Sequence, residues 1–168
     1  MIFKIFEKSV TVSRRIYLKH TNEKIWNLIS SKRALELFHP YCLKNEVLSW
    51  DNNKIDKLIY LNGLEYIREF DTWRPYIGYD LYIGKKDGKK SLVKWKIEDH
   101  GEGCAVCISV KPYKSSRVPN YFYFLAHIFV IKPKLKKYLN SVLKGLRYYL
   151  DNQQPVKKNH FGKHPWFS

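Results

Sequence analysis

The sequence lacks a hydrophobic run long enough to cross a membrane as a helix. Its longest apolar stretch, residues 121–131, has about eleven residues, whereas a membrane-spanning helix needs about 20. Pro119 and Pro133 bracket this stretch, so a helix can begin after the first proline and bend or restart at the second. The pattern therefore predicts the buried front part of a C-terminal helical region rather than a membrane anchor.

Acidic residues are also scarce, because 15 Asp and Glu stand against 31 Lys and Arg, for a formal net charge of +16. Such a charge is compatible with anionic partners, including nucleic acid and acidic membranes. However, most of the lysines are scattered, which favours solubility over recognition. The basic clusters 85–90, 132–137 and 156–158 have no interleaved aromatic platform, so nucleic acid has no positive support.

Cysteines are few, and the motifs of metal and nucleotide chemistry are missing. Three cysteines, with no signal-peptide pattern ahead of them, predict a reducing, cytoplasmic environment. Cys104 and Cys107 form one C-x-x-C in a strand-like segment, where residues three apart face opposite sides. His160 and His164 are separated by Gly162, which disfavours a shared helix. With no Walker loop, Rossmann fingerprint or nucleophile elbow, we expect no metal and no cofactor.

Seven segments have the alternation or β-branched composition of strands. The first is 10–18, and six more follow at 43–50, 54–61, 64–73, 76–85, 91–99 and 104–113. Asn-Gly at 62–63 and Asp-Gly at 87–88 are hairpin signals, because both central residues of a type I′ turn need positive φ. Sequential strands joined by hairpins predict an antiparallel meander, to which the first strand adds a seventh member.

Helical periodicity appears on both sides of the meander. Between 20 and 41, a cap at Thr21 or Asn22 and a break at 30–31 predict two short helices. From Leu135 to Leu150 the apolar residues keep one face over four turns, which predicts a long amphipathic helix. The expected fold class is α+β: a curved seven-stranded antiparallel sheet wrapped on this C-terminal helix, the only element long enough to cover it.

This order of elements resembles the START-like, or helix-grip, superfamily, in particular its polyketide cyclase/dehydrase-like (SRPBCC) branch. The resemblance is carried by "NEKIWNLISSKRALELFHPY", "YLNGLEYIREFDTWRP", "VKWKIEDHGEGCAVCISV" and "PKLKKYLNSVLKGLRYYL", and covers roughly residues 8–151. It implies a deep cavity between the sheet and the C-terminal helix, with 121–131 packed over its mouth, for hydrophobic or amphipathic ligands. It leaves the chemistry open, because the superfamily contains transporters, sensors, cyclases and chaperone activators.

The domain organisation that follows is one START-like domain, 1–151, and a short tail, 152–168. The tail is basic and aromatic, and we expect it to dock on the domain or on a partner chain through Phe161, Trp166 and Phe167. The sequence leaves open whether the protein is a monomer or a homodimer.

Two arginines stand out on otherwise apolar strand faces. Arg14 shares a face with Val12 and Ile16, and Arg68 shares one with Tyr66 and Phe70. A buried guanidinium must be paired. Its partner is either a protein carboxylate or an anionic ligand group held in a bidentate fork, and the sequence leaves both readings open.

Histidines and aromatic residues complete the candidate site. His39 lies where family members close one end of the cavity, so we expect it to line the pocket. An acid–base role for it is a second hypothesis, because imidazole titrates near neutrality. The full set of expected ligand-binding residues is Arg14, Phe38, His39, Tyr66, Arg68, Phe70, Tyr79, Trp95, Phe124 and His127.

Three functions fit these observations. The leading hypothesis is a cytoplasmic protein that binds a hydrophobic or amphipathic small molecule or lipid, with Arg14 and Arg68 as anchors for an anionic end. The second is a cyclase, aromatase or dehydratase that folds and desolvates a polyketide-like ligand. The third is a peripheral membrane or interaction module that uses the basic surface, with transient contact to anionic membrane.

Overall fold

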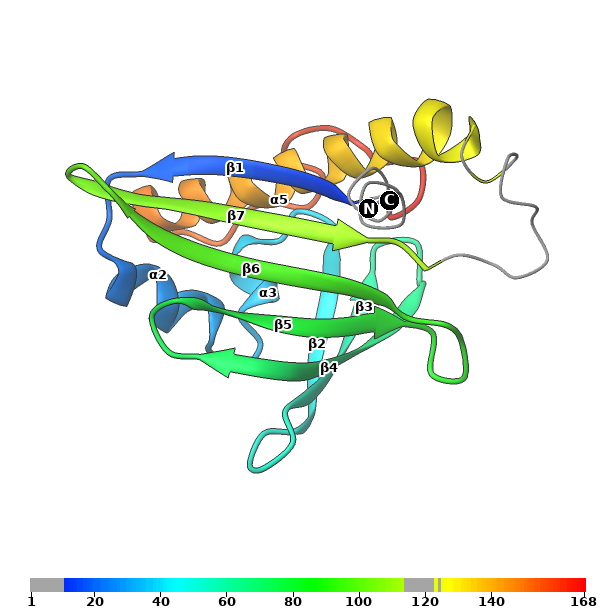
Figure 1. Cartoon of the computed structure of the whole chain (residues 1–168), viewed down its shortest axis with the longest axis horizontal. Helices are drawn as coiled ribbons and strands as arrows, with labels where there is room; N and C mark the ends of the chain where they lie inside the picture. The colour runs from blue at the N-terminus through cyan, green and yellow to red at the C-terminus, as the bar shows by residue number, and fades with distance from the viewer. Residues whose placement is uncertain (1–10, 114–122, 124) are drawn as a thin grey trace, which may run out of the picture.

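A computed structural model describes residues 11–113, 123 and 125–168 of the chain. It contains the predicted order of elements, in which a strand and two short helices precede six strands and a long helix (Figure 1). The elements are β1 (Val12–Leu18), α2 (Asn22–Ile29), α3 (Leu35–Phe38), β2 (Cys42–Ser49), β3 (Ile55–Tyr60), β4 (Glu65–Arg74), β5 (Gly78–Gly84), β6 (Ser91–His100), β7 (Gly103–Lys111), the π-helical turn η1 (His127–Ile131) and α5 (Lys132–Asn152).

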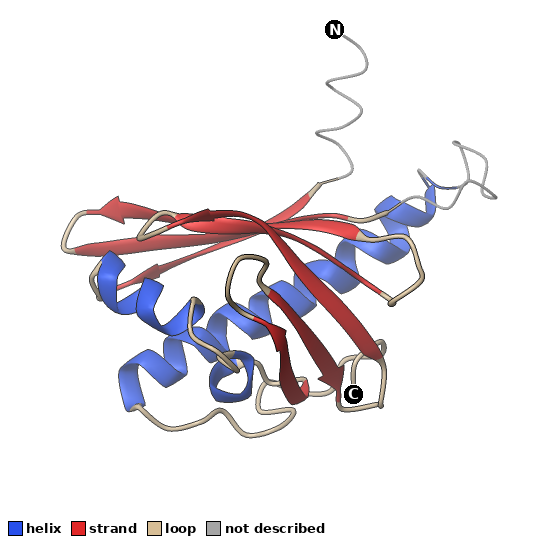
Figure 2. Cartoon of the chain, turned by 90° about the horizontal axis from the view of Figure 1, so that it is seen from below, coloured by secondary structure: helices blue, strands red, loops and turns tan. Residues whose placement is uncertain are grey.

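The seven strands form one antiparallel sheet in the order β1-β7-β6-β5-β4-β3-β2. Five of the six pairings join strands that are consecutive in the sequence. The sixth joins β1 to β7, so that β1 lies at one edge of the sheet. Figure 2 shows the sheet curving around the helices, which lie on its concave side. The predicted α+β fold class and meander are confirmed, and every strand end falls within two residues of its predicted position.

The long helix is held by the apolar stripe that its sequence predicts. Its buried residues face the sheet and the short helices, whereas Lys144 and Arg147 are exposed on the other side. Pro133 lies in the first turn of α5, directly after the π-helical turn η1, and has no backbone N–H to donate into that turn. The buried apolar side chains of α5 are Leu135, Leu139, Val142, Leu143, Leu146 and Leu150.

The predicted alternation of β4 fails after Phe70. Its pairing with β5 shifts register between Phe70 and Thr72, so that Trp73 pairs with Tyr79. An extra residue in one strand sends the following side chains to the opposite face. Trp73 therefore takes the inward position that strict alternation from Phe70 would give to Thr72, and its ring stacks on Tyr79 at 5.6 Å. Alternation within the predicted strand 76–85 would likewise put Ile77 on the face of Tyr79, but Ile77 precedes β5 and is 50% exposed.

The tail after α5 lies against the domain. The Val156 and Asn159 amides donate to the carbonyl oxygens of Leu37 and Pro40, at 2.8 and 2.9 Å. Phe167 is buried, and its ring stacks on Tyr60 at 4.3 Å. The chain end thus packs beside the edge of the sheet formed by β2 and β3.

Gly145 sets how closely α5 approaches α3. A Cβ at this position would lie 2.0 Å from the carbonyl oxygen of Phe38, which is far inside van der Waals contact. A glycine in a helix interior normally lowers stability relative to alanine. Here its absent side chain allows the two backbones to meet.

We predict that Gly145→Ala lowers the free energy of unfolding by about 1–3 kcal/mol, as overpacking does, although alanine is the better helix former. Urea denaturation measures this change. Lys144→Ala is the control on the same helix and should stay within about 0.5 kcal/mol of the parent protein. A Gly145→Ala protein as stable as the parent would contradict the close approach of α5 to α3.

Candidate ligand-binding cavity

A cavity of about 520 Å³ lies between the sheet and α5. This volume falls in the range of small-molecule sites, roughly 300–1,000 Å³. Apolar side chains from four strands and the helix form most of its wall, among them Leu58, Leu81, Val93, Ile108, Leu139 and Val142.

The cavity reaches solvent at the turn between β5 and β6. Lys85, Gly88 and Lys89 line it and are exposed. Ala126 and Ile131, from the helical segment before α5 and from η1, also line it. The expectation that 121–131 covers the cavity mouth falls partly on residues 121, 122 and 124, which lie outside the described residues. Among the described residues of 121–131, those on the outer side of η1 are exposed rather than buried.

Polar groups gather where α3, β3 and α5 meet. His39 follows the last turn of α3, Tyr60 ends β3, and Tyr138 lies on α5. The Nε2 of His39 is 2.8 Å from the Tyr138 hydroxyl, which is 3.2 Å from the Tyr60 hydroxyl. All three side chains line the cavity.

Burial keeps these groups neutral. Burial, and to a smaller extent the nearby Arg68 charge, lower the pKa of His39 to about 3. Burial also raises the pKa of Tyr60 and of Tyr138 above the ordinary tyrosine value. The cluster therefore carries no charge at neutral pH.

Arg68 lines the cavity, but its charge is already paired. Its Nε and Nη2 donate to the two carboxylate oxygens of Asp56 at 2.7 and 2.6 Å. Asp56 is fully buried. Burial works against the guanidinium charge, but the Asp56 carboxylate holds the pKa of Arg68 above its ordinary value. Of the two partners that the sequence left open, the structure contains the protein carboxylate.

Four of the ten expected residues line the cavity: His39, Tyr66, Arg68 and Trp95. The others, except Phe124, which is outside the described residues, lie elsewhere. Phe38, Phe70 and Tyr79 belong to the core beside the cavity, where their rings contact other aromatic rings. The aromatic cluster consists of Trp26, Phe38, Phe70, Trp73, Tyr79 and Trp95.

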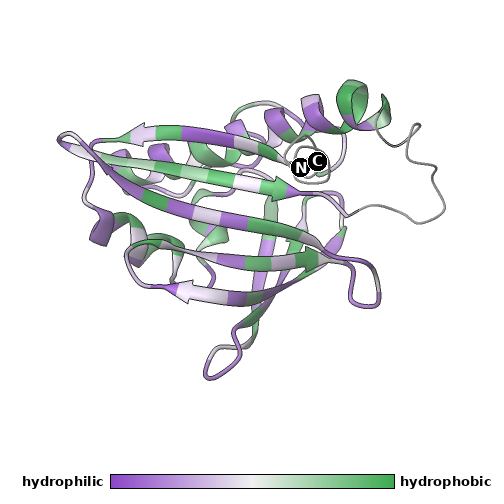
Figure 3. Ribbon diagram, viewed as in Figure 1, coloured by the Kyte–Doolittle hydropathy of each residue, from purple (hydrophilic) through white to green (hydrophobic). Residues whose placement is uncertain are grey.

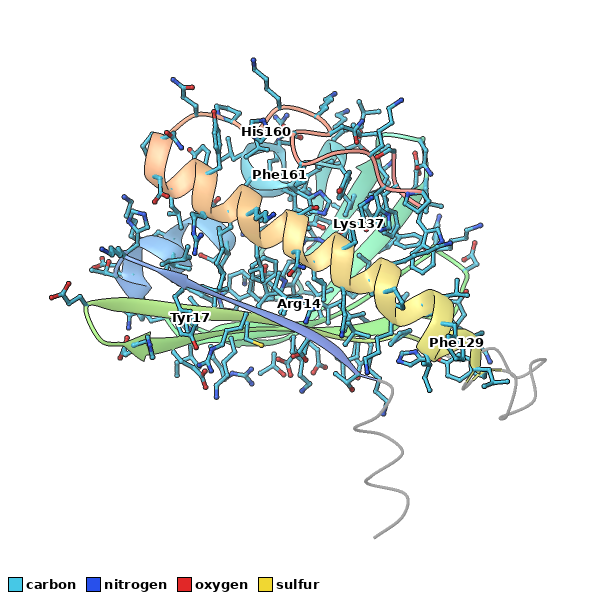
Figure 4. The ribbon with its side chains drawn as sticks, turned by 90° about the horizontal axis from the view of Figure 1, so that it is seen from above. Arg14, Tyr17, Phe129, Lys137, His160 and Phe161 are labelled. Carbon is cyan, nitrogen blue, oxygen red and sulfur yellow. The ribbon has the colours of Figure 1, made fainter. Side chains whose placement is uncertain are left out.

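Arg14 and His127 do not line the cavity either. Arg14 is half-buried on β1 (Figure 4), and its Nη1 makes a long contact of 3.4 Å with the Ser13 carbonyl oxygen. His127 is buried in η1, where its ring approaches that of Tyr123.

Sequence reasoning missed Tyr60, Tyr138, Trp166 and Phe167 as lining residues. Tyr138 is a tyrosine within a stripe of leucines and valines, and that polar handle was a usable signal. The partner of Arg68 was not readable in this way, because a two-residue turn at 62–63 would place Lys57 opposite Arg68, whereas the observed register pairs Arg68 with Asp56. The positions of Trp166 and Phe167 had no such signal, because the tail has no periodicity.

Together, the curved sheet and the long helix on its concave side define a helix-grip fold, with an apolar pocket between them. No family model matches the chain, and no curated protein matches its sequence. Among the described residues, no helix combines the length and apolar character needed to span a bilayer.

Solved structures share this fold. A START superfamily protein from Mycobacterium smegmatis is 14% identical with a TM-score of 0.67, covering 86% of this chain and 99% of that one. DynU16, from the dynemicin biosynthetic locus, is 12% identical with a TM-score of 0.65, covering 89% of this chain and 50% of its own. Ara h 8.0201 is 15% identical with a TM-score of 0.60, covering 83% and 96%. These likenesses show that the chain has the same helix-grip fold as these proteins.

The low pKa of His39 predicts a loss of stability on mild acidification. The unfolded chain binds a proton at His39 below about pH 6.5, whereas the folded protein does so only near pH 3. The free energy of unfolding should therefore fall as pH drops between these values, by up to about 1.4 kcal/mol per unit.

Urea denaturation at pH 7 and pH 5 tests this prediction in the parent protein and in His39→Gln. The drop should be larger in the parent by about 2 kcal/mol. The other histidines are common to both proteins and cancel in the comparison. Equal drops would mean that His39 titrates alike in the folded and unfolded states.

Proposed function

We propose that the protein binds a hydrophobic or amphipathic small molecule or lipid in the cavity between the sheet and α5. The observation that carries this proposal is the cavity itself, about 520 Å³ with mainly apolar walls. Protein interiors are packed about as densely as organic crystals, so an apolar space of this size is unusual for core packing and is suited to a ligand. Binding would bury apolar ligand surface at about 25 cal/mol per Å².

The titrating groups of the cavity favour binding over proton-transfer catalysis. General acids and bases work best with a pKa near the operating pH. Burial instead lowers the pKa of His39 to about 3 and raises the pKa of Tyr138. His39 is therefore a weak base at neutral pH, and Tyr138 a weak acid. A cyclase-type activity would have to rely on folding and desolvating its substrate.

The proposal predicts that a neutral fluorescent probe, N-phenyl-1-naphthylamine, binds the parent protein and is displaced by apolar ligands. The double variant Ile83→Trp/Val110→Trp should weaken probe binding at least about tenfold, because both side chains line the cavity and the indoles would fill it. Native mass spectrometry of gently purified protein should show a retained small molecule in the parent and less in this variant.

The matched control is Leu48→Trp/Ile77→Trp, at two exposed positions outside the cavity wall. This control should bind the probe like the parent. Absence of binding in the parent, or equal weakening in both double variants, would contradict a ligand site in the cavity. Circular dichroism confirms that each variant is folded.

A second function, ligand exchange at an anionic membrane, is favoured by the surface beside the cavity. In η1, Ile128, Phe129 and Val130 are exposed by 37%, 73% and 44%, and Figure 3 shows this end of the helical region as strongly hydrophobic. Exposed apolar side chains of this kind insert into the interfacial region of a bilayer.

Lysines complement this apolar turn. Lys85 and Lys89, in the turn between β5 and β6, line the same cavity as Ala126, just before η1, and Ile131, the last residue of η1. Figures 1 and 2 both place this turn and η1 at the same end of the molecule. Each lysine near an anionic surface contributes about 1 kcal/mol. A bilayer facing this end would therefore meet an apolar insert and basic residues together.

We expect the protein to sediment with vesicles that contain phosphatidylserine and to do so less at high salt. Phe129→Asp should reduce vesicle binding at least about fivefold, because it puts a charge on the inserted turn. Tyr17→Asp is the control, since Tyr17 is 52% exposed on β1, away from Phe129 (Figure 4). Binding that survives Phe129→Asp, or that falls equally in both variants, would exclude η1 as the membrane contact.

A further inference from the structure

A directed chain of hydrogen bonds ends at the cavity wall. It begins at the backbone N–H of Tyr41, which is a donor only and lies 3.2 Å from Nδ1 of His39. Nδ1 must accept this bond and therefore holds no proton. Because burial lowers the pKa of His39 to about 3, the ring is neutral, and its single proton is on Nε2. Nε2 then donates to the Tyr138 hydroxyl at 2.8 Å.

This chain of hydrogen bonds ends at the hydroxyls of Tyr138 and Tyr60. The hydrogen bond between them uses only one of their two protons. Tyr138 and Tyr60 are 3.2 Å apart at their oxygens, and either can donate to the other. Each hydroxyl has one proton, so one O–H remains without an acceptor whichever way the bond runs. Within the described part of the chain neither hydroxyl has a further partner, and both side chains line the cavity.

Among the described residues that line the cavity, no buried charge near this spare O–H is left unpaired. His39 is neutral, and the Arg68 charge is matched by the bidentate Asp56 carboxylate. The other charged side chains that line the cavity, Lys85 and Lys89, are exposed at the turn between β5 and β6. A carboxylate beside the tyrosines would thus be buried without a counter-ion, which is costly. A neutral acceptor meets no such penalty.

We propose that the cavity selects neutral amphiphiles whose polar end is a hydrogen-bond acceptor, such as a carbonyl oxygen, bound by the spare O–H of the Tyr60–Tyr138 pair. This inference rests on the proposed ligand-binding function and specifies the ligand class. It replaces the expectation of an anionic ligand end held by Arg14 and Arg68. The apolar wall holds the chain of the ligand, and the tyrosine pair fixes which end lies between β3 and α5.

Three ligands of equal chain length test the proposal: nonane, 2-nonanone and nonanoate at pH 8, each displacing N-phenyl-1-naphthylamine. 2-Nonanone should bind the parent protein about fivefold to tenfold more tightly than nonane, as expected for one added hydrogen bond, and more tightly than nonanoate. In Tyr60→Phe/Tyr138→Phe the preference for the ketone over the alkane should disappear. The single variant Tyr138→Phe should reduce this preference, and it provides the test if the double variant does not fold.

The matched control is Tyr79→Phe, which removes the same hydroxyl from a buried tyrosine that does not line the cavity. It should keep the preference for the ketone. Infrared spectroscopy gives a second readout, because the carbonyl stretch of bound 2-nonanone should shift to lower frequency in the parent and in Tyr79→Phe, but not in the double variant.

The outcomes separate this inference from the proposed function. If the probe binds but nonane displaces it as well as 2-nonanone does, the ligand site stands and the tyrosine donor is refuted. Nonanoate binding as tightly as the ketone, and weakened by Tyr138→Phe, would also refute a neutral ligand class. Failure of the probe to bind the parent protein would refute both proposals.

Discussion

The structure depends on one packing constraint: a single helix covers the concave apolar face of a curved seven-stranded sheet. A helix with its side chains is about 10–12 Å across, which is narrower than the sheet that curves around α5 (Figure 2). The helix lies close to α3 at Gly145, where the two backbones meet. Space between the helix and the far strands must therefore be filled by large side chains or by something else.

Both solutions occur side by side on the same face. Near α2, rings such as Trp26, Trp73 and Tyr79 interlock and fill the space. Next to them, leucine and valine side chains from the strands and α5 leave the cavity. Aromatic residues bury the largest areas of any side chains, so the boundary between core and cavity is the place where the aromatic cluster ends.

Polar groups in this apolar setting are tolerated because each is paired or neutral. The Arg68–Asp56 pair is bidentate, which offsets the cost of burying both charges. His39 remains neutral and uses both ring nitrogens, one toward the Tyr41 amide and the other toward Tyr138. The tyrosine pair is the exception, since one of its two O–H groups has no acceptor among the described residues, and both side chains line the cavity.

Much of the fold could be predicted because it depends on local patterns. Alternation and Asn-Gly or Asp-Gly turns located all seven strands, and a stripe of period 3.6 located α5. The face of Trp73 could not be predicted in this way, since one bulged residue in β4 reverses the alternation. Docking of the tail could be predicted from its aromatic residues but its position could not, because the contact of Phe167 with Tyr60 is distant in sequence and follows no repeat.

By itself, the sequence determined the order of elements, the apolar face of each element and the presence of an arginine that had to be paired. These properties depend on neighbours within a few residues or within one hairpin. Only the tertiary structure decided that Asp56 satisfies Arg68, that Phe38 and Tyr79 fill the core, and that His39, Tyr60 and Tyr138 meet at the cavity. These outcomes depend on how far the sheet curves before it meets α5, and that curvature results from the packing of the whole chain rather than from any one segment.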